Sequence, residues 1–289
     1  MSTEPAARNA AERAPALVDA GMTIAVALAK VSPGLPPLEA RILMGHALAM
    51  SKVQLITRDH LVLDAGQAAL INDLFKRRMA GEPVAYLTGE REFFGLSFEV
   101  GPDVLIPRPE TELLVELAIE RLPAGASALD LGTGSGAIAI TMARARPDAR
   151  IEAIDVSAAA LALARRNARR HEVAVNFVQS NWYQAVEGRR FDLLVSNPPY
   201  IVAGDRHLRE GDLRFEPVDA LTDHADGLSA LRILAAGASR HLHSGGWLLM
   251  EHGFDQAGAV RTLLSSYGMQ DVQSWYDLAG IARVSGGRL

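Results

Sequence analysis

The chain has 289 residues, no cysteine and a formal net charge of −5. The absence of cysteine excludes disulfides, thiolate metal sites and cysteine nucleophiles. With 49% hydrophobic and 22% charged residues, the composition is typical of a globular protein that buries its own core. No apolar run reaches the ~18 residues that span a bilayer. We therefore expect a soluble, cytoplasmic protein without a membrane segment.

The first 81 residues are predicted to form a short tail and a small helical domain. Residues 1–14 are rich in alanine and are expected to be flexible, whereas residues 15–81 show helical patterns. Pro36 and Pro37 suit the first turn of a helix, and Asp64 can cap a helix that runs to Met79. Residues 1–90 carry nine basic and nine acidic side chains, so they lack the basic face of a module that binds a nucleic-acid duplex.

A change in composition marks residues 82–107. Residues 92–100 are aromatic and interrupted by Gly95, which is typical of a β-hairpin. Pro102 and Pro107 follow. We interpret this region as a hairpin linker that packs on both neighbours.

Helices and strands are predicted to alternate through residues 108–289. The predicted helices are 111–121, 137–145, 158–170, 228–242 and 256–266, and the predicted strands are 127–131, 151–155, 173–179, 191–196 and 246–251, with two short strands near 272–275 and 281–284. This alternation predicts a parallel sheet covered by helices on both faces, with its ligand site at the carboxyl ends of the strands. The long loop 201–227 follows such an end, and we expect it to be mobile and to contribute to substrate binding.

A glycine loop follows the first strand of this region and opens a helix. It reads Gly132-Thr133-Gly134-Ser135-Gly136. Its glycines let the backbone approach a ligand, and the helix supplies free amide donors. Asp155, at the end of the second strand, can accept both hydroxyls of a ribose. The pattern indicates a nucleoside-containing cofactor, either S-adenosylmethionine or a dinucleotide, and the alternative is a purely structural turn. Asp130 favours S-adenosylmethionine, as an acid near the amino group of that cofactor.

The strand at 191–196 ends in a rigid turn. The turn reads Asn197-Pro198-Pro199-Tyr200. Because its prolines remove two amide donors, it offers acceptors, including the side-chain oxygen of Asn197. A planar nitrogen gains positive charge as it attacks a methyl sulfonium, and acceptors aimed at its hydrogens stabilise that charge. Tyr200 can stack on a flat acceptor group. The simpler interpretation is a structural Pro-Pro turn, which the preceding glycine loop and Asp155 disfavour.

Other polar and aromatic groups are less specific. His241 and His243 resemble a metal-binding pair, but they end a predicted helix, where histidine complements the helix dipole, and no metal site is predicted. Glu251 and His252 follow another strand and can approach the cofactor pocket, although we do not expect direct catalysis there. Trp182 is placed to pack against an adenine, or alternatively in the core.

Together these motifs resemble the HemK/PrmC family, the glutamine methyltransferases of peptide chain release factors. The resemblance covers nearly the whole chain from residue 15. Besides the glycine loop and the Asn-Pro-Pro-Tyr turn, it is carried by residues 83–89, 105–112, 216–217, 226–228 and 277–280. The most characteristic block is Arg108-Pro109-Glu110-Thr111-Glu112.

The resemblance implies an α/β fold with a class I (Rossmann-like) methyltransferase sheet at residues 108–289, joined to the N-terminal helical domain by the hairpin linker. It implies methyl transfer from S-adenosyl-L-methionine to the glutamine of the Gly-Gly-Gln loop of release factors. The implied catalytic residues are Asn197, Pro198 and Tyr200. The implied cofactor-binding residues are Gly132, Thr133, Gly134, Ser135, Gly136, Asp155, Trp182 and Asn197. The implied glutamine-binding residues are Asn197, Pro198, Pro199 and Tyr200.

Two positions depart from the family pattern, and three other functions stay open. Asn181 stands where an acid that touches adenine is common, and Ile281-Ala282 replaces a more polar pair. The alternatives are a nucleic-acid adenine or cytosine methyltransferase, a dinucleotide-dependent oxidoreductase and a non-catalytic binding module. We expect release factors as partners, no nucleic acid, no membrane and a monomeric state.

Overall fold

The computed structural model describes residues 17–289, and the tail predicted at residues 1–14 lies outside this range. The chain forms two compact units, Met1–Thr88 and Gly89–Leu289. The predicted linker, residues 82–107, is divided between them. Within the described range, no helix is long and apolar enough to cross a membrane.

The described part of the N-terminal unit is a helical bundle. Its helices are α1 (Ile24–Val31), α2 (Pro37–Leu48), α3 (Lys52–Thr57), α4 (Ala65–Met79) and α5 (Val84–Thr88). As predicted, α2 begins at Pro37, and Asp64 caps α4 by accepting a hydrogen bond from Gln67 N at 2.8 Å. Phe75 of α4 is fully buried in the core. Helix α5 lies in the predicted linker, where no helix was expected.

The second unit contains a hairpin, a seven-stranded sheet and the helices that cover the sheet. In chain order its elements are β1 (Glu90–Phe93), β2 (Leu96–Glu99), η1 (Pro109–Thr111), α6 (Glu112–Arg121), β3 (Ser127–Leu131), α7 (Ala137–Ala145), β4 (Arg150–Asp155), α8 (Ala158–Arg170), β5 (Val175–Gln179), η2 (Trp182–Val186), β6 (Phe191–Ser196), η3 (Arg206–Arg209), η4 (Gly211–Phe215), α9 (Val218–Leu221), α10 (Ser229–His241), β7 (Leu242–Glu251), α11 (Ala257–Ser266), β8 (Gln270–Tyr276) and β9 (Ala282–Arg288), where η marks a 3-10 helix. The predicted class I α/β architecture is confirmed.

The sheet has the strand order β5-β4-β3-β6-β7-β9-β8. Strands β3 to β7 are parallel, whereas β9 is antiparallel to both of its neighbours. The prediction of a parallel sheet is wrong at this edge, because only residues 277–281 join β8 to β9, too few for a parallel crossover. Strand order reverses between β3 and β6, the position at which such sheets bind ligands.

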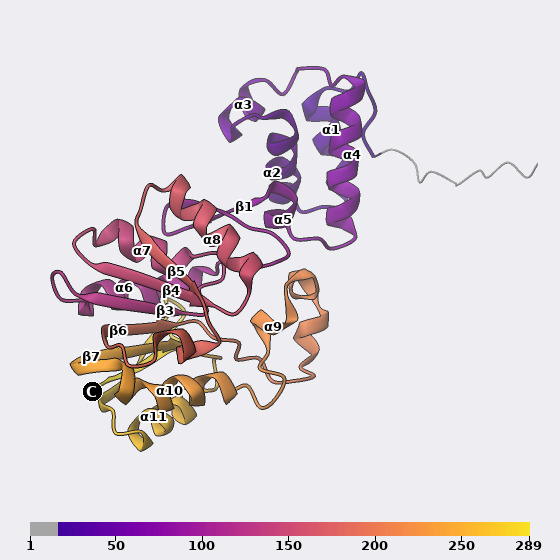
Figure 1. Cartoon of the computed structure of the whole chain (residues 1–289). Coiled ribbons are helices and arrows are strands. Elements are labelled where there is room, and N and C mark those ends of the chain that lie inside the picture. Colours follow the sequence, from indigo (N-terminus) through magenta and orange to yellow (C-terminus); the bar gives the residue numbers. More distant parts are fainter. Residues whose placement is uncertain (1–16) are drawn as a thin grey trace, which may run out of the picture. The chain divides into compact units, whose positions relative to one another are not determined.

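Alternate residues of the strands supply two cores. Ala128, Leu193 and Leu249 face one core, whereas their neighbours Leu129 and Leu194 face the other. Helices α6 and α7 contribute to the first core, and α10 and α11 to the second. Figure 1 shows these helices on opposite faces of the sheet. Burial on both faces explains why the central strands read as nearly continuous apolar runs.

The hairpin of β1 and β2 is fixed to the sheet domain through α8. Its turn residues Phe94 and Gly95 have φ values of 52° and 73°, as a two-residue hairpin turn requires. Asn167 of α8 accepts a hydrogen bond from Glu99 N at 2.8 Å and donates to Glu99 O at 3.0 Å. Asn167 also donates to Ser135 O at 2.9 Å, so one buried amide joins the hairpin to the glycine loop.

The segment between β6 and α10, predicted as one long loop, has local helical structure. It contains η3, η4 and α9. The side chain of Glu216 is completely buried and accepts a hydrogen bond from Ile106 N at 2.9 Å, and it forms an ion pair with Arg108. This pairing of residues far apart in the sequence anchors the segment, while its mobility and its role in substrate binding stay predictions.

Candidate active site

The glycine loop connects β3 to α7 at the switch point of the sheet. Gly132 N donates to Ile154 O at 2.9 Å, which fixes the loop to β4. Gly134 has a φ of +55°, and no atom of the described residues lies within 4 Å of where a Cβ would stand. At Gly136 a Cβ would lie only 3.1 Å from the Cβ of Ala164. The two glycines are therefore needed for different reasons. Gly134 leaves the backbone open to the cavity, whereas Gly136 allows close packing against α8.

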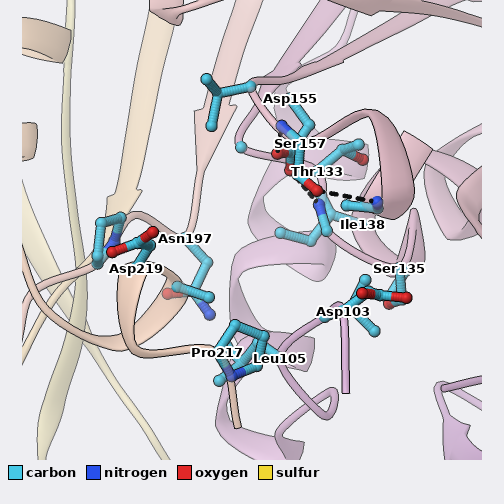
Figure 2. A pocket seen from close by; sticks show the side chains of 18 of the residues that line it. Asp103, Leu105, Thr133, Ser135, Ile138, Asp155, Ser157, Asn197, Pro217 and Asp219 are labelled. Atoms are coloured by element: carbon cyan, nitrogen blue, oxygen red, sulfur yellow. Dashed lines mark hydrogen bonds between the residues drawn. The ribbon is translucent and has the colours of Figure 1, made fainter. Parts of the chain in front are cut away.

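Asp155 lies beside this loop at the carboxyl end of β4. Its Oδ2 accepts a hydrogen bond from Gly134 N at 2.8 Å, and its Oδ1 accepts one from Ser157 N at 2.9 Å. Burial raises the pKa of Asp155, and these backbone hydrogen bonds oppose the rise. The carboxylate is thus held in one orientation at the wall of a cavity (Figure 2).

This cavity has a volume of about 390 Å³, within the range of small-molecule sites. The predicted residues that line it are Gly132, Thr133, Gly134, Ser135, Asp155, Trp182, Asn197 and Pro199. Gly136, Pro198 and Tyr200 are not among the residues that line it. The cavity also has walls that were not predicted, at Asp103 and Leu105 before η1 and at Pro217 and Asp219 around α9 (Figure 2).

Trp182 lines the cavity and has an unusual backbone conformation. Its φ is +48°, a left-handed conformation that is rare for a bulky side chain. Ser180 Oγ donates to Trp182 O at 2.7 Å and helps to hold this turn. The indole lies 3.8 Å from where a Cβ at Gly132 would stand. Strained residues of this kind cluster at ligand sites.

Asn197 lies directly after β6, across the cavity from Asp155 (Figure 2). Its Nδ2 donates to Thr111 Oγ1 at 3.1 Å, which turns the side-chain oxygen away from Thr111. Thr111, at the end of η1, is buried and also lines the cavity. The Asn-Pro-Pro-Tyr turn and the Arg108–Glu112 block, 86 residues apart at this contact, therefore form one site.

Tyr200 is directed toward β7 rather than into the cavity lining. Its Oη donates to Glu251 Oε1 at 3.2 Å. Burial is the main reason that the pKa of Tyr200 is raised, so the phenol stays neutral. The hydroxyl is occupied in this bond, which leaves the ring as the part of Tyr200 available for stacking.

Asp130 lies beneath the glycine loop. Thr133 Oγ1 donates to its Oδ2 at 2.6 Å, while Oδ1 is buried and has no hydrogen-bond partner within residues 17–289. Burial raises the pKa of Asp130 to about 7. Asp130 does not line the cavity, so its bond to Thr133, which does, is its connection to the site.

His241 has a structural environment. Its ring stacks on Tyr183 with centroids 4.5 Å apart, and its Nδ1 bonds to Arg189 O at 3.0 Å. No group of three potential metal ligands occurs in the part of the chain that is described.

The residues present fit S-adenosylmethionine. Asp155 offers a carboxylate for ribose hydroxyls, and the glycine loop offers open backbone. The exposed Asn181 also lines the cavity, so an amide rather than an acid is presented there. Across the cavity, Asn197 offers an acceptor for the second substrate.

Two family models match the chain, each in one of the two units. The PrmC N-terminal domain matches residues 23–89. The methyltransferase small domain matches residues 109–210, a range that includes both the glycine loop and the Asn-Pro-Pro-Tyr turn.

Curated relatives match over nearly the full length. A protein of Burkholderia pseudomallei named release factor glutamine methyltransferase is 57% identical, with 92% of this chain and 96% of the relative covered. Proteins of the same name from Bordetella pertussis and Neisseria gonorrhoeae are 52% and 50% identical, with 89% and 88% of this chain and 96% and 94% of the relatives covered.

Solved structures support the fold alone. A methyltransferase from Pyrococcus furiosus has a TM-score of 0.52 at 23% identity, covering 73% of this chain and 94% of its own. The hMettl16 catalytic domain, solved in complex with MAT2A 3'UTR hairpin 1, has a TM-score of 0.54 at 16% identity, covering 75% and 80%. Proteins with this fold include one solved with RNA, so the acceptor must be argued from the site and the relatives.

Proposed function

The chain belongs to the family of release factor glutamine methyltransferases, and we propose that it methylates a peptide chain release factor. The methyl group comes from S-adenosylmethionine, and the acceptor is the side-chain amide nitrogen of the glutamine in the Gly-Gly-Gln loop. The observation that carries the proposal is the position of Asn197, an acceptor at the cavity wall opposite Asp155.

The chemistry follows from the weak nucleophilicity of an amide. S-adenosylmethionine supplies a methyl group on a positively charged sulfur. The oxygen of Asn197 accepts a hydrogen bond from the glutamine NH2, which orients the nitrogen lone pair and stabilises the positive charge that develops on it. The rigid Pro198-Pro199 pair keeps this acceptor in place, and the ring of Tyr200 supports the flat amide. No strong base is needed before transfer, because the nitrogen becomes acidic only once it is methylated.

The cofactor residues are proposed from the geometry described above. Asp155 binds the ribose hydroxyls, and the glycine loop from Gly132 to Gly136 approaches the cofactor through its backbone. Trp182 packs on the adenine. These roles are supported by the fixed carboxylate, the open position at Gly134 and the indole at the cavity wall.

We propose in addition that residues 15–81 recognise the release factor and that residues 82–107 connect them to a catalytic domain at residues 108–289. Charge supports a protein partner over nucleic acid, since residues 1–90 carry equal numbers of acids and bases. We also propose that the protein acts as a monomer and that it works in the cytoplasm, where translation takes place.

A labelled-cofactor assay tests the proposed function. The protein is incubated with labelled S-adenosylmethionine and either an intact release factor or DNA, and the modified residue is mapped by mass spectrometry. We expect label on the glutamine of the release factor. Label on DNA instead would support the nucleic-acid methyltransferase, and binding of cofactor without transfer to either would support a non-catalytic module.

A further inference from the structure

Glu251 is a buried carboxyl group beside the Asn-Pro-Pro-Tyr turn. It ends β7, the neighbour of β6 in the sheet, so it lies at the edge from which the turn starts. The residue is only 1% exposed. Its Oε1 accepts the hydrogen bond from Tyr200, whereas Oε2 is buried without a hydrogen-bond partner in the described chain. An unsatisfied buried oxygen is energetically costly, and such groups often occur at functional sites.

Thr111 connects this carboxyl group to Asn197. Its hydroxyl accepts from Asn197 Nδ2 at 3.1 Å and lies near enough to Glu251 to act on the pKa of that group. Burial raises the pKa of Glu251 and this hydroxyl lowers it, while Oε2 of Glu251 remains open to the Thr111 hydrogen. A hydroxyl has one hydrogen to donate. If that hydrogen points to Glu251, Thr111 presents only lone pairs to Asn197, whose amide must then direct its nitrogen toward Thr111.

We propose that Glu251 is a positioning residue for methyl transfer, whose carboxylate sets the orientation of the Asn197 amide through Thr111 and that of Tyr200 directly. The inference rests on the proposed function, in which the Asn197 oxygen orients the acceptor nitrogen. With the amide reversed, its NH2 group would face the NH2 group of the glutamine, and two donors would meet.

The charge on Glu251 controls this orientation. The ionisable groups around it are Glu110 of η1, Tyr200 after β6, His252 directly after β7 and Arg283 of β9. Burial, opposed by the hydroxyls of Thr111 and Tyr200, leaves the pKa of Glu251 at about 7. Above this pH the carboxylate draws the Thr111 hydrogen toward itself. Below it, the protonated acid donates to Thr111, whose own hydrogen is then free to bond the oxygen of Asn197.

NMR of the Asn197 side-chain amide tests the network without any acceptor protein. The two signals are assigned by their loss in Asn197→Ser. In the unmodified protein they should shift as the pH falls from about 8 to about 6, and Glu251→Gln should abolish that titration and move the signals at the upper pH. Glu110→Gln should retain the titration. The same titration in Glu251→Gln as in the unmodified protein overturns the proposal, whatever the acceptor is.

Turnover on intact release factor gives the second measurement. Glu251→Gln should lower turnover about 10- to 100-fold at saturating substrates, with cofactor affinity unchanged. Thr111→Val should lose a similar factor, and the double variant should lose no more than either alone, because the residues act through one network. Losses that multiply would contradict this mechanism.

A matched control is Asp192→Asn, which alters a carboxylate at the other end of β6 that accepts from Ser127 N at 2.8 Å. Its turnover should be normal. If the unmodified protein transfers no methyl to any release factor, the proposed function fails, and the NMR titration still decides the role of Glu251.

Discussion

The two units of the chain differ in which side chains they bury and which they expose. All fourteen buried polar or charged residues of the described chain lie in the second unit, between Thr111 and Ser285. The N-terminal unit buries only apolar side chains and proline in its described part, yet it holds nine of the seventeen exposed large apolar residues. Active sites concentrate buried polar and titratable groups, and surfaces that bind proteins are often richer in exposed apolar side chains. The difference supports our proposal that the second unit carries out catalysis and that the N-terminal unit recognises the release factor.

The largest expected effect is on turnover at Asn197. Asn197→Ala should lower turnover about 100- to 1,000-fold, because one preorganised partner of the transition state is lost. Cofactor affinity, measured by calorimetry, should remain. Normal turnover on saturating release factor would show that the Asn-Pro-Pro-Tyr turn is only structural. It would also remove the main argument for placing catalysis in the second unit.

The next effect is on stability. Arg108→Met leaves the buried Glu216 carboxylate without its cation, which should cost about 3 kcal/mol, or roughly 6–12 °C in the melting temperature. Arg166→Met is the matched control, since it removes an exposed ion pair with Glu99 worth about 1 kcal/mol at most. Equal melting temperatures for the two variants would show that burial does not distinguish these pairs.

Cofactor affinity should depend on Asp155. Two hydrogen bonds to ribose are worth about 1.5–3 kcal/mol each, so Asp155→Ala should weaken binding at least about tenfold. Because burial raises the pKa of Asp155 and the carboxylate is the better acceptor, affinity in the unmodified protein should fall on acidification earlier than for an ordinary aspartate. Calorimetry over a pH series measures both the affinity of the variant and the pH dependence of the unmodified protein. Unchanged binding by the variant would show that Asp155 does not bind the cofactor.

The smallest effect is expected in the N-terminal unit. Val53 and Ile56 of α3 are 68% and 62% exposed. Replacing both by serine should lower activity on intact release factor about five- to tenfold, as for the loss of interface anchors. Activity on a short Gly-Gly-Gln peptide and the melting temperature should change little, because exposed substitutions typically cost less than about 0.5 kcal/mol. Equal losses on the factor and the peptide would point to a folding role for this unit.

Local signals explain what the sequence could predict. Elements β3, α7, α8 and β6 have the predicted bounds, because glycines or a polar turn stand at their ends. The start of β7 was placed four residues too late, at residue 246 instead of Leu242, because Gly245 and Gly246 interrupt the apolar pattern. The loop and the turn were likewise visible as motifs, which is why the cavity contains most of the predicted residues.

Long-range pairing explains what the sequence could not predict. The bonds from Asn197 to Thr111 and from Arg108 to Glu216 join residues 86 and 108 positions apart, and no local pattern indicates such partners. The resemblance did include Thr111 and Glu216, but as parts of motifs without a contact. The sequence analysis expected the segment 201–227 to contribute to substrate binding, but it did not single out Pro217 and Asp219 as part of the cavity wall, for the same reason.

The three hydrogen bonds of Asn167 determine where a fragment that contains only the catalytic unit can begin. Two of them end on the backbone of Glu99 and one on Ser135, and the amide is fully buried. A fragment that starts at residue 108 would leave Asn167 with only the bond to the glycine loop, and would strip two partners from a group that water cannot reach in the intact unit. A fragment that starts at Gly89 keeps all three. The hairpin is thus a minimum requirement for any isolated, transplanted or fused version of this methyltransferase domain.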